Sequence, residues 1–234
     1  MDIRCLPLLA AALCLSSCVI DTVTGPERHE SRTIERDAAE RVHVNLAMGA
    51  GTLIVGGGAR KLLNADFAYN VASWEPEVRY SSTGTRGDLT IRQPGQNHAQ
   101  IGHTRCQWDL SLNNEVPMDL TLHLGAGEAR LDLGSLSLRT VEVNMGVGKL
   151  QMDLRGNPKH NYDVRIRGGV GEATVYLPAN VGVYAEGAGG IGEFRTQGLH
   201  RQYGYWVNDA YEDSKVRIHL DIHGGIGSIR LIAD

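Results

Sequence analysis

A Gly-x-Gly tripeptide with alternating apolar residues on both sides recurs along this chain of 234 residues. In residues 120–133, with the sequence LTLHLGAGEARLDL, every second residue is apolar before Gly125 and again after Gly127. Alternation with a period of two is typical of a strand that is buried on one face. Each copy therefore predicts two half-buried strands that are joined at a corner.

The same template fits five further places, whose first glycines are Gly49, Gly146, Gly169, Gly190 and Gly225. A unit of this length cannot bury its apolar face alone, so the copies must stack. The sequence predicts an all-β protein, a β-solenoid or single-stranded β-helix-like stack of strand-(Gly-x-Gly)-strand rungs. We expect the glycines to let successive rungs approach closely, and the residue between them to point into the core.

Two other classes of protein fit the chain less well. A phosphate-binding Gly-rich loop needs a strand that enters a helix, with a third glycine or a lysine in register, and no copy supplies these. The formal net charge of −4 comes from interspersed charges of both signs, without a basic patch with interleaved aromatic residues. Nucleic acid is therefore not an expected partner.

Residues 1–17 are predicted to be a lipoprotein signal peptide. One arginine precedes an apolar run, and Leu15-Ser16-Ser17-Cys18 resembles a lipobox, in which the chain is cut before a cysteine that then carries lipid. Two or three acyl chains on Cys18 would hold the protein stably on a membrane lipid layer. Val19, rather than Asp, is compatible with the outer membrane facing the periplasm in a Gram-negative host. The alternatives are an ordinary cleaved secretory signal and, less well supported, a single membrane-spanning anchor.

The polar, charged stretch that follows indicates a tether, so we expect a lipidated cysteine and tether at 18–41 and one solenoid domain at 42–234. Cleavage would leave Cys106 as the sole unmodified cysteine, which excludes an intramolecular disulfide. Without a nearby base, Cys106 is expected to be a small buried hydrophobic residue and not a reactive thiol.

An insertion between Leu199 and Lys215 separates the last two copies of the repeat and concentrates aromatic residues, namely Tyr203, Tyr205, Trp206 and Tyr211. One interpretation is a loop that binds an envelope protein or a glycan. The other is a flap that covers an open end of the stack and prevents edge-to-edge association.

His219, Asp221 and His223 alternate with apolar residues and so share the outer face of one strand. Such a set can hold a transition metal if a neighbouring strand donates another ligand, and Glu186 is the donor that the template offers. Solvated strand histidines are the preferred interpretation, so we expect no metal site and no cofactor. Mixed-charge columns that begin at Glu128 and Arg130 are expected to keep the outer face soluble, or to form a binding strip.

Several segments resemble the bacterial toast-rack family. They are WDLSLN at 108–113, VPMDL at 116–120, LGAGEA at 124–129, VNDAY at 207–211 and GGIGSI at 224–229. The resemblance implies a β-helix-like stack found in envelope proteins, many of them lipoproteins. It extends more distantly to adhesin-like proteins and to the extracytoplasmic part of membrane proteins in cell-wall-antibiotic responses. The family has no established catalytic residues to carry over.

These observations together predict a non-catalytic, exported, lipid-anchored binding or scaffolding module of the cell envelope. The alternatives are a regulatory domain in envelope stress and, less well supported, a polysaccharide-active β-helix enzyme. The enzyme would need paired carboxylates in a cleft, whereas the carboxylates here are dispersed along single strands.

Overall fold

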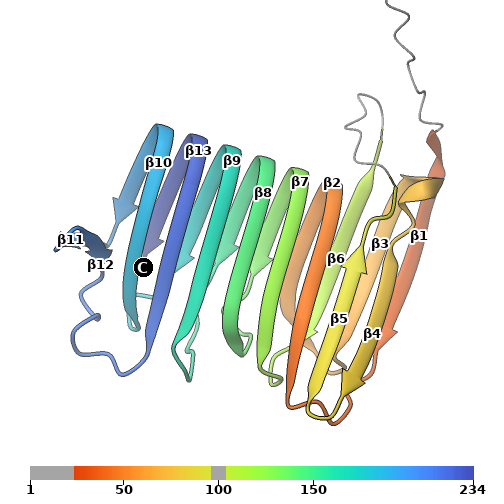
Figure 1. Ribbon diagram of the computed structural model, residues 1–234, viewed down its shortest axis with the longest axis horizontal. Coiled ribbons are helices and arrows are strands. Elements are labelled where there is room, and N and C mark those ends of the chain that lie inside the picture. Colours follow the sequence, from red (N-terminus) through yellow and green to blue (C-terminus); the bar gives the residue numbers. More distant parts are fainter. Residues whose placement is uncertain (1–23, 96–103) are drawn as a thin grey trace, which may run out of the picture.

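The computed structural model describes residues 24–95 and 104–234, which form an open stack of strands (Figure 1). The described residues contain 13 strands in one sheet system, with β1, β3, β6, β2, β7, β8, β9, β13, β10, β12 and β11 hydrogen-bonded in that order. The strands are β1 (Thr24–Ile34), β2 (Arg41–Ala59), β3 (Leu63–Val71), β4 (Glu77–Thr83), β5 (Arg86–Arg92), β6 (Cys106–Asn113), β7 (Met118–Asp132), β8 (Leu138–Asp153), β9 (Tyr162–Leu177), β10 (Gly182–Gln197), β11 (His200–Gln202), β12 (Tyr205–Val207) and β13 (Arg217–Ala233). One short 3₁₀ helix, η1 (Ala72–Trp74), is the only helix in these ranges, which therefore contain no helix that could span a membrane.

Each long strand passes through its Gly-x-Gly and folds back, so that one strand supplies both arms of a rung. Leu120 of β7 pairs with Val141 of β8 before the corner, and Leu131 pairs with Met152 after it, all in parallel register. Both arms of a rung thus lie beside the same neighbouring rung (Figure 1). The predicted all-β solenoid of strand-corner-strand rungs is confirmed.

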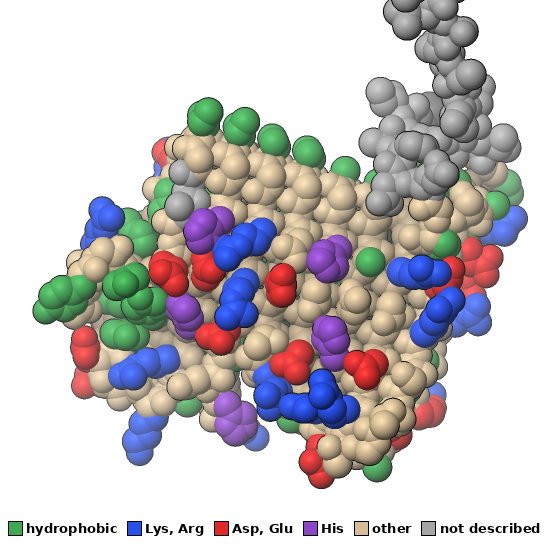
Figure 2. Space-filling view, viewed as in Figure 1, with side chains coloured by type: hydrophobic (Ala, Val, Ile, Leu, Met, Phe, Trp, Pro, Cys, Tyr) green, Lys and Arg blue, Asp and Glu red, His purple; other side chains and the backbone are tan. Residues whose placement is uncertain are grey.

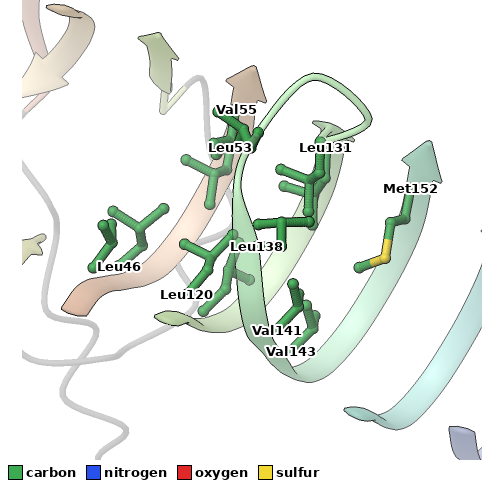
Figure 3. Close-up of a cluster of buried hydrophobic side chains, with 14 of the residues drawn as sticks. Leu46, Leu53, Val55, Leu120, Leu131, Leu138, Val141, Val143 and Met152 are labelled. Carbon is green, nitrogen blue, oxygen red and sulfur yellow. The ribbon is translucent and has the colours of Figure 1, made fainter. Parts of the chain in front are cut away.

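The core lies between the two arms. Figure 3 shows Leu46 and Leu53 of β2 beside Leu120 and Leu131 of β7, with the side chains directed into the space that the bent strands enclose. These four side chains are at most 2% exposed. The period-two pattern of the sequence thus places alternate residues inside, as the arms require.

The residue between the two glycines does not point into the core, and that prediction is wrong. Val147, Val170, Ile226 and Ile191 occupy this place, and 53%, 47%, 53% and 74% of their surfaces are exposed. The inward-facing residues of the two arms fill the space under each corner, as Leu124 and Ala129 do in β7, both 1% exposed. The corner residue therefore remains on the convex outer edge.

The last two rungs are not stacked in chain order. β13 lies between β9 and β10 and pairs in parallel with both. β10, which contains the degraded repeat at Gly190, is thus the outer rung at this end. The insertion forms β11 and β12, and β12 pairs with β10 through Tyr184↔Val207 and Ala185↔Trp206.

The N-terminal end is closed by antiparallel strands. β5 and β6 pair with the two arms of β2 and make a split rung, while β4 lies against β5 and β3 lies against β6. Residues 24–34, expected to be part of the tether, form β1, which pairs with β3. Backbone pairing stabilises this strand although its side chains are mostly exposed, which is why the apolar pattern did not indicate it. The signal peptide, Cys18 and the rest of residues 1–23 lie outside the described residues.

Candidate functional site

Aromatic side chains gather at the C-terminal end of the stack. The Tyr184 ring of β10 lies 4.6 Å from the ring of Tyr205, 6.0 Å from that of Tyr211 and 5.0 Å from the His219 imidazole, centroid to centroid. Burial, and after it a hydrogen bond with Tyr205, raises the pKa of the Tyr184 phenol above its ordinary value. These four residues are called the tyrosine cluster below.

Tyr203 stands apart from this cluster, at the turn that joins β11 to β12. Its φ is 49°, and φ of the following Gly204 is 94°. Two successive positive φ angles are typical of a tight hairpin turn, in which a bulky residue at the first position is uncommon. The Tyr203 side chain is 93% exposed. The hairpin thus holds an aromatic side chain away from the protein.

Trp206 points to the other side of β12 from Tyr205, as alternation along a strand requires. Its ring stacks on Phe194 of β10, with centroids 6.2 Å apart, and the Arg201 guanidinium lies 5.7 Å from it. Trp206 therefore fastens the hairpin to the outer rung. Of the four aromatic residues predicted to bind, the structure brings Tyr205 and Tyr211 together and leaves Tyr203 and Trp206 separate.

Asn208 fixes the chain immediately after β12. It is 3% exposed, and its Nδ2 donates to the carbonyl oxygens of Pro178, Ala179 and Val181 at 3.2, 3.3 and 2.7 Å. Its Oδ1 accepts a hydrogen bond from the Val183 amide at 2.9 Å. This buried amide ties the insertion to the turn that precedes β10, so the hairpin has a fixed base.

His219, a member of the cluster, also contacts acidic side chains of the two neighbouring strands. The His219 Nδ1 lies 3.3 Å from Asp163 Oδ1 of β9, and its Nε2 lies 3.2 Å from Glu186 Oε1 of β10. Glu186, the expected neighbour of this strand, pairs with Asp221 in the parallel register. Asp163 was not indicated by the sequence, because the exchanged order of β13 and β10 could not be read from the repeat.

Asp221 and His223 both form hydrogen bonds with Arg167 of β9. The Arg167 guanidinium donates to both Asp221 carboxylate oxygens at 2.8 and 3.1 Å, and to His223 Nδ1. The hydrogen bond from Arg167 is the largest of the effects that hold the pKa of Asp221 below its ordinary value. Residues 24–95 and 104–234 contain no group of three or more His, Cys, Asp or Glu side chains placed to hold a metal ion. A cation at Asp221 would have to displace Arg167.

Two further features of the sequence can be placed. Cys106 is a free cysteine and 5% exposed, and burial raises the pKa of its thiol to about 12, so it is a buried hydrophobic residue as predicted.

The mixed-charge columns have the expected register, since Glu128 pairs with Lys149 and Lys149 with Glu172. Ion pairs in these columns form along one strand, as between Glu128 and Arg130 at 3.5 Å.

Tyr184 is the central residue of the cluster, although the sequence indicated it only as a neighbour of His219. It lies in the degraded repeat, seven positions before the corner residue Ile191. The signal that could have identified it is an aromatic side chain at an outward position, where the other rungs carry the polar residues Asp163 and His219.

An open stack of bent, parallel-paired strands, with charged columns on its outer face and an aromatic end, defines a solenoid-type scaffold. The chain belongs to the toast-rack family: the family described as the N-terminal domain of toast_rack matches residues 23–176. A second family, described as the C-terminal part of the cell wall-active antibiotics response protein LiaF, matches residues 126–231.

Among solved structures, the chain is similar to a “putative cell adhesion protein” from Clostridium sporogenes, with 34% identity and a TM-score of 0.84. That match covers 89% of this chain and 100% of the other. “Putative adhesins” from Bacteroides fragilis and Parabacteroides distasonis share 7% and 12% identity, with TM-scores of 0.28 and 0.25. Each match covers 88% of this chain and 97% of the other. No curated protein matches the sequence.

Proposed function

We propose that this protein is a lipid-anchored, non-catalytic binding module of the cell envelope that engages its partner through the hairpin β11–β12 and the tyrosine cluster. The observation that carries the proposal is the exposure of Tyr203, 93%, on a hairpin whose base is fixed by the ring contact of Tyr205 with Tyr184. An exposed aromatic side chain on a preorganised support is typical of a binding hot spot, because little conformational entropy is lost on contact.

The partner is an envelope protein or an envelope glycan, since rings can pack on the apolar faces of either. The relative with 34% identity supports adhesion as the general role. The acidic and aromatic side chains at this end, among them Glu186 and Tyr211, provide hydrogen-bonding groups around the rings. These groups can serve either kind of partner.

The binding experiment is photo-cross-linking in intact cells with a photoreactive amino acid at Tyr203. The matched control places the same group at Thr83, an exposed residue of β4 at the other end of the stack. A recurrent protein adduct at Tyr203 and not at Thr83 would identify an adaptor, and a glycan adduct would identify an adhesin-like role. Equal adduct patterns at both positions would contradict the proposal.

The lipid anchor is proposed from Leu15-Ser16-Ser17-Cys18, and in a Gram-negative host Val19 favours the outer membrane. The variant Cys18→Ala should move the protein from the membrane to the soluble fraction and remove the acyl mass from the N-terminal peptide. Cys14→Ala, four residues earlier, is the control and should leave both unchanged. The anchor would be contradicted if the wild-type N-terminal peptide carried no acyl mass and the Cys18→Ala variant stayed in the membrane fraction.

A second candidate function is the response to cell-wall-active antibiotics, because the family with that description matches residues 126–231, which include the whole hairpin. In this case the partner would be a membrane sensor. Deletion of the gene should then change the sensitivity of the cells to cell-wall antibiotics, and Tyr203→Ala should reproduce the change. Unchanged sensitivity after deletion would exclude this role.

A further inference from the structure

The exposed large hydrophobic residues of the described chain fall in two places only. Tyr203 and Tyr205 belong to the hairpin, and the other four are the corner residues Val147, Val170, Ile226 and Ile191. They follow one another in the parallel register on β8, β9, β13 and β10. We call these four residues the corner ridge, and Figure 2 shows hydrophobic side chains in a row along that edge.

The ridge lies outside the buried core of its own chain. Its side chains are 47% to 74% exposed, and the arms below supply the core. With rungs about 4.8 Å apart, the four residues form an apolar line about 15 Å long. Isolated apolar residues on a surface are ordinary, but a continuous row on one edge is typical of a contact surface.

Apolar surface continues inward beneath the ridge. The inward position just before the corner holds Met48, Leu124 and Met145 in three rungs, but Gly168 and Gly224 in the next two. The missing side chains leave a cavity of about 50 Å³ whose apolar walls include Met145, Leu150, Ile166, Ile222 and Ile229. An apolar hollow therefore lies beneath this part of the edge.

The chain enters the structure at this same edge. Thr24, the first described residue, pairs with Val71, while Tyr69 of the same strand pairs with Cys106. A Cβ on Gly51, in the corner of β2, would overlap the carbonyl oxygen of Cys106. The start of β1 and the bends of the long strands therefore lie on the same side (Figure 1).

A lipid on Cys18 would place a membrane near the edge that carries the ridge. Five residues lie between Cys18 and Thr24, so a fully extended link of six steps spans at most about 22 Å. An arm of about seven residues is itself about 23 Å long, so the opposite edge lies just beyond the reach of this link. The lipid would hold the N-terminal end, and the ridge lies on the four rungs farther along the stack.

We infer that the corner ridge rests on the membrane surface, where its apolar side chains enter the headgroup region and lay the stack along the bilayer. The inference rests on the proposed lipid anchor at Cys18. The outward residues that follow the ridge on its four rungs are Lys149, Glu172, Ser228 and Glu193, which carry both signs with an excess of carboxylates. The contact is therefore shallow and does not depend on anionic lipid.

The test uses the full lipidated protein in phosphatidylcholine–phosphatidylethanolamine vesicles, with a fluorophore on Val170→Cys or Ile226→Cys. Lys159→Cys, exposed in the link between β8 and β9 at the opposite edge, is the matched control. Native Cys106 is 5% exposed with a thiol pKa of about 12, so it should not react with the label. All three positions are exposed, and unchanged melting temperatures will show that the variants fold.

Spin-labelled acyl chains should quench the ridge labels at least about threefold more than the Lys159→Cys label, because interfacial contact reaches about 5–10 Å into the headgroup boundary. Iodide in the aqueous phase should show the reverse order. Ridge labels as open to iodide as Lys159→Cys would overturn the inference. The ridge labels could instead be protected from iodide without being quenched by the spin-labelled lipid, and lose this protection when the protein is diluted. That result would show that a second copy of the chain covers the ridge, and it would also overturn the inference.

The mass of the N-terminal peptide separates this result from the proposed function. Acylated Cys18 with solvent-exposed ridge labels would refute the membrane contact and leave the anchor intact. An unacylated Cys18 would refute the anchor, and with it the inference.

Discussion

The Tyr205 ring lies 4.6 Å from the Tyr184 ring at an interplanar angle of 36°, so the insertion is held on the outer rung by aromatic contact as well as by backbone pairing. Only two residue pairs join β12 to β10, Tyr184↔Val207 and Ala185↔Trp206. Side-chain contacts must therefore supply much of the stability of the hairpin.

Tyr184→Ala should loosen the hairpin without unfolding the stack. It removes the ring contacts with Tyr205, Tyr211 and His219, and such contacts contribute about 0.5–1.5 kcal/mol for an aromatic pair. We expect a loss of about 2 kcal/mol in local stability, measured as faster hydrogen exchange of the Val207 amide. Tyr184→Phe keeps the ring and should retain most of the protection. Unchanged exchange in the Ala variant would show that the ring contacts do not hold the hairpin.

The corner glycines should tolerate no side chain, as Gly148 shows. Its φ is 141°, and a Cβ there would overlap the Gly127 carbonyl oxygen in the next rung. Gly148→Ala thus combines backbone strain with a clash between rungs, and we expect a loss of more than about 3 kcal/mol of unfolding free energy.

Gly58→Ala is the matched control for this variant. Gly58 also has a positive φ, 100°, but a Cβ there meets no atom within 4 Å. Only backbone strain remains, so the expected loss is about 1 kcal/mol. Urea denaturation of both variants measures the difference, and equal losses would show that close stacking is not what requires glycine at the corners.

The sequence was sufficient to predict the rungs because their signal is local and repeated. Alternation around Gly125 and Gly146 fixes which arm residues are buried, and the observed register pairs Gly127 with Gly148 as the template requires. The orientation of Val147 was predicted incorrectly for a physical reason. Alternation is interrupted once at each corner, and periodicity alone does not say on which residue the interruption falls.

The site was only partly predictable, because it depends on contacts between distant segments. The insertion was recognised from its composition, but the repeat has the same pattern in each rung and so does not indicate that β13 lies between β9 and β10. β10 makes the outer rung, and the short hairpin covers only the start of its free edge. The contacts of His219 with Asp163 and Glu186 follow from that exchange.

Asn208→Ala should be among the more destabilising polar substitutions. The buried amide of Asn208 serves the carbonyls of Pro178, Ala179 and Val181 and the Val183 amide, and its loss leaves these groups without a partner. We expect about 2–4 kcal/mol less unfolding free energy, because each buried unsatisfied group costs about 1–3 kcal/mol.

The control for this variant is Asn161→Ala. Asn161 accepts one hydrogen bond from the Arg217 amide at 2.9 Å and is exposed, so water can replace it. Its loss should be below about 1 kcal/mol. Thermal denaturation measures both variants, and a small effect of Asn208→Ala would mean that water enters the turn and satisfies the carbonyls.

The ion pair of Asp221 with Arg167 should make a small, pH-dependent contribution to stability. The pKa of Asp221 lies below its ordinary value of 3.8 because the guanidinium stabilises the carboxylate. A carboxyl group whose pKa is depressed in the folded state stabilises the protein above the unfolded pKa, and this contribution is lost as the pH falls through the folded value. Asp221→Asn should therefore lower the unfolding free energy at neutral pH by at most about 1 kcal/mol, since the Arg167 side chain is 45% exposed and water screens the pair. The difference between the variant and the wild type should shrink as the pH falls below 3.8 and vanish below the folded pKa.

Urea denaturation at a series of pH values measures this difference in unfolding free energy. The control is Asp213→Asn, at an exposed acidic residue of the insertion. A difference that persists unchanged at low pH would assign the effect to packing and not to charge.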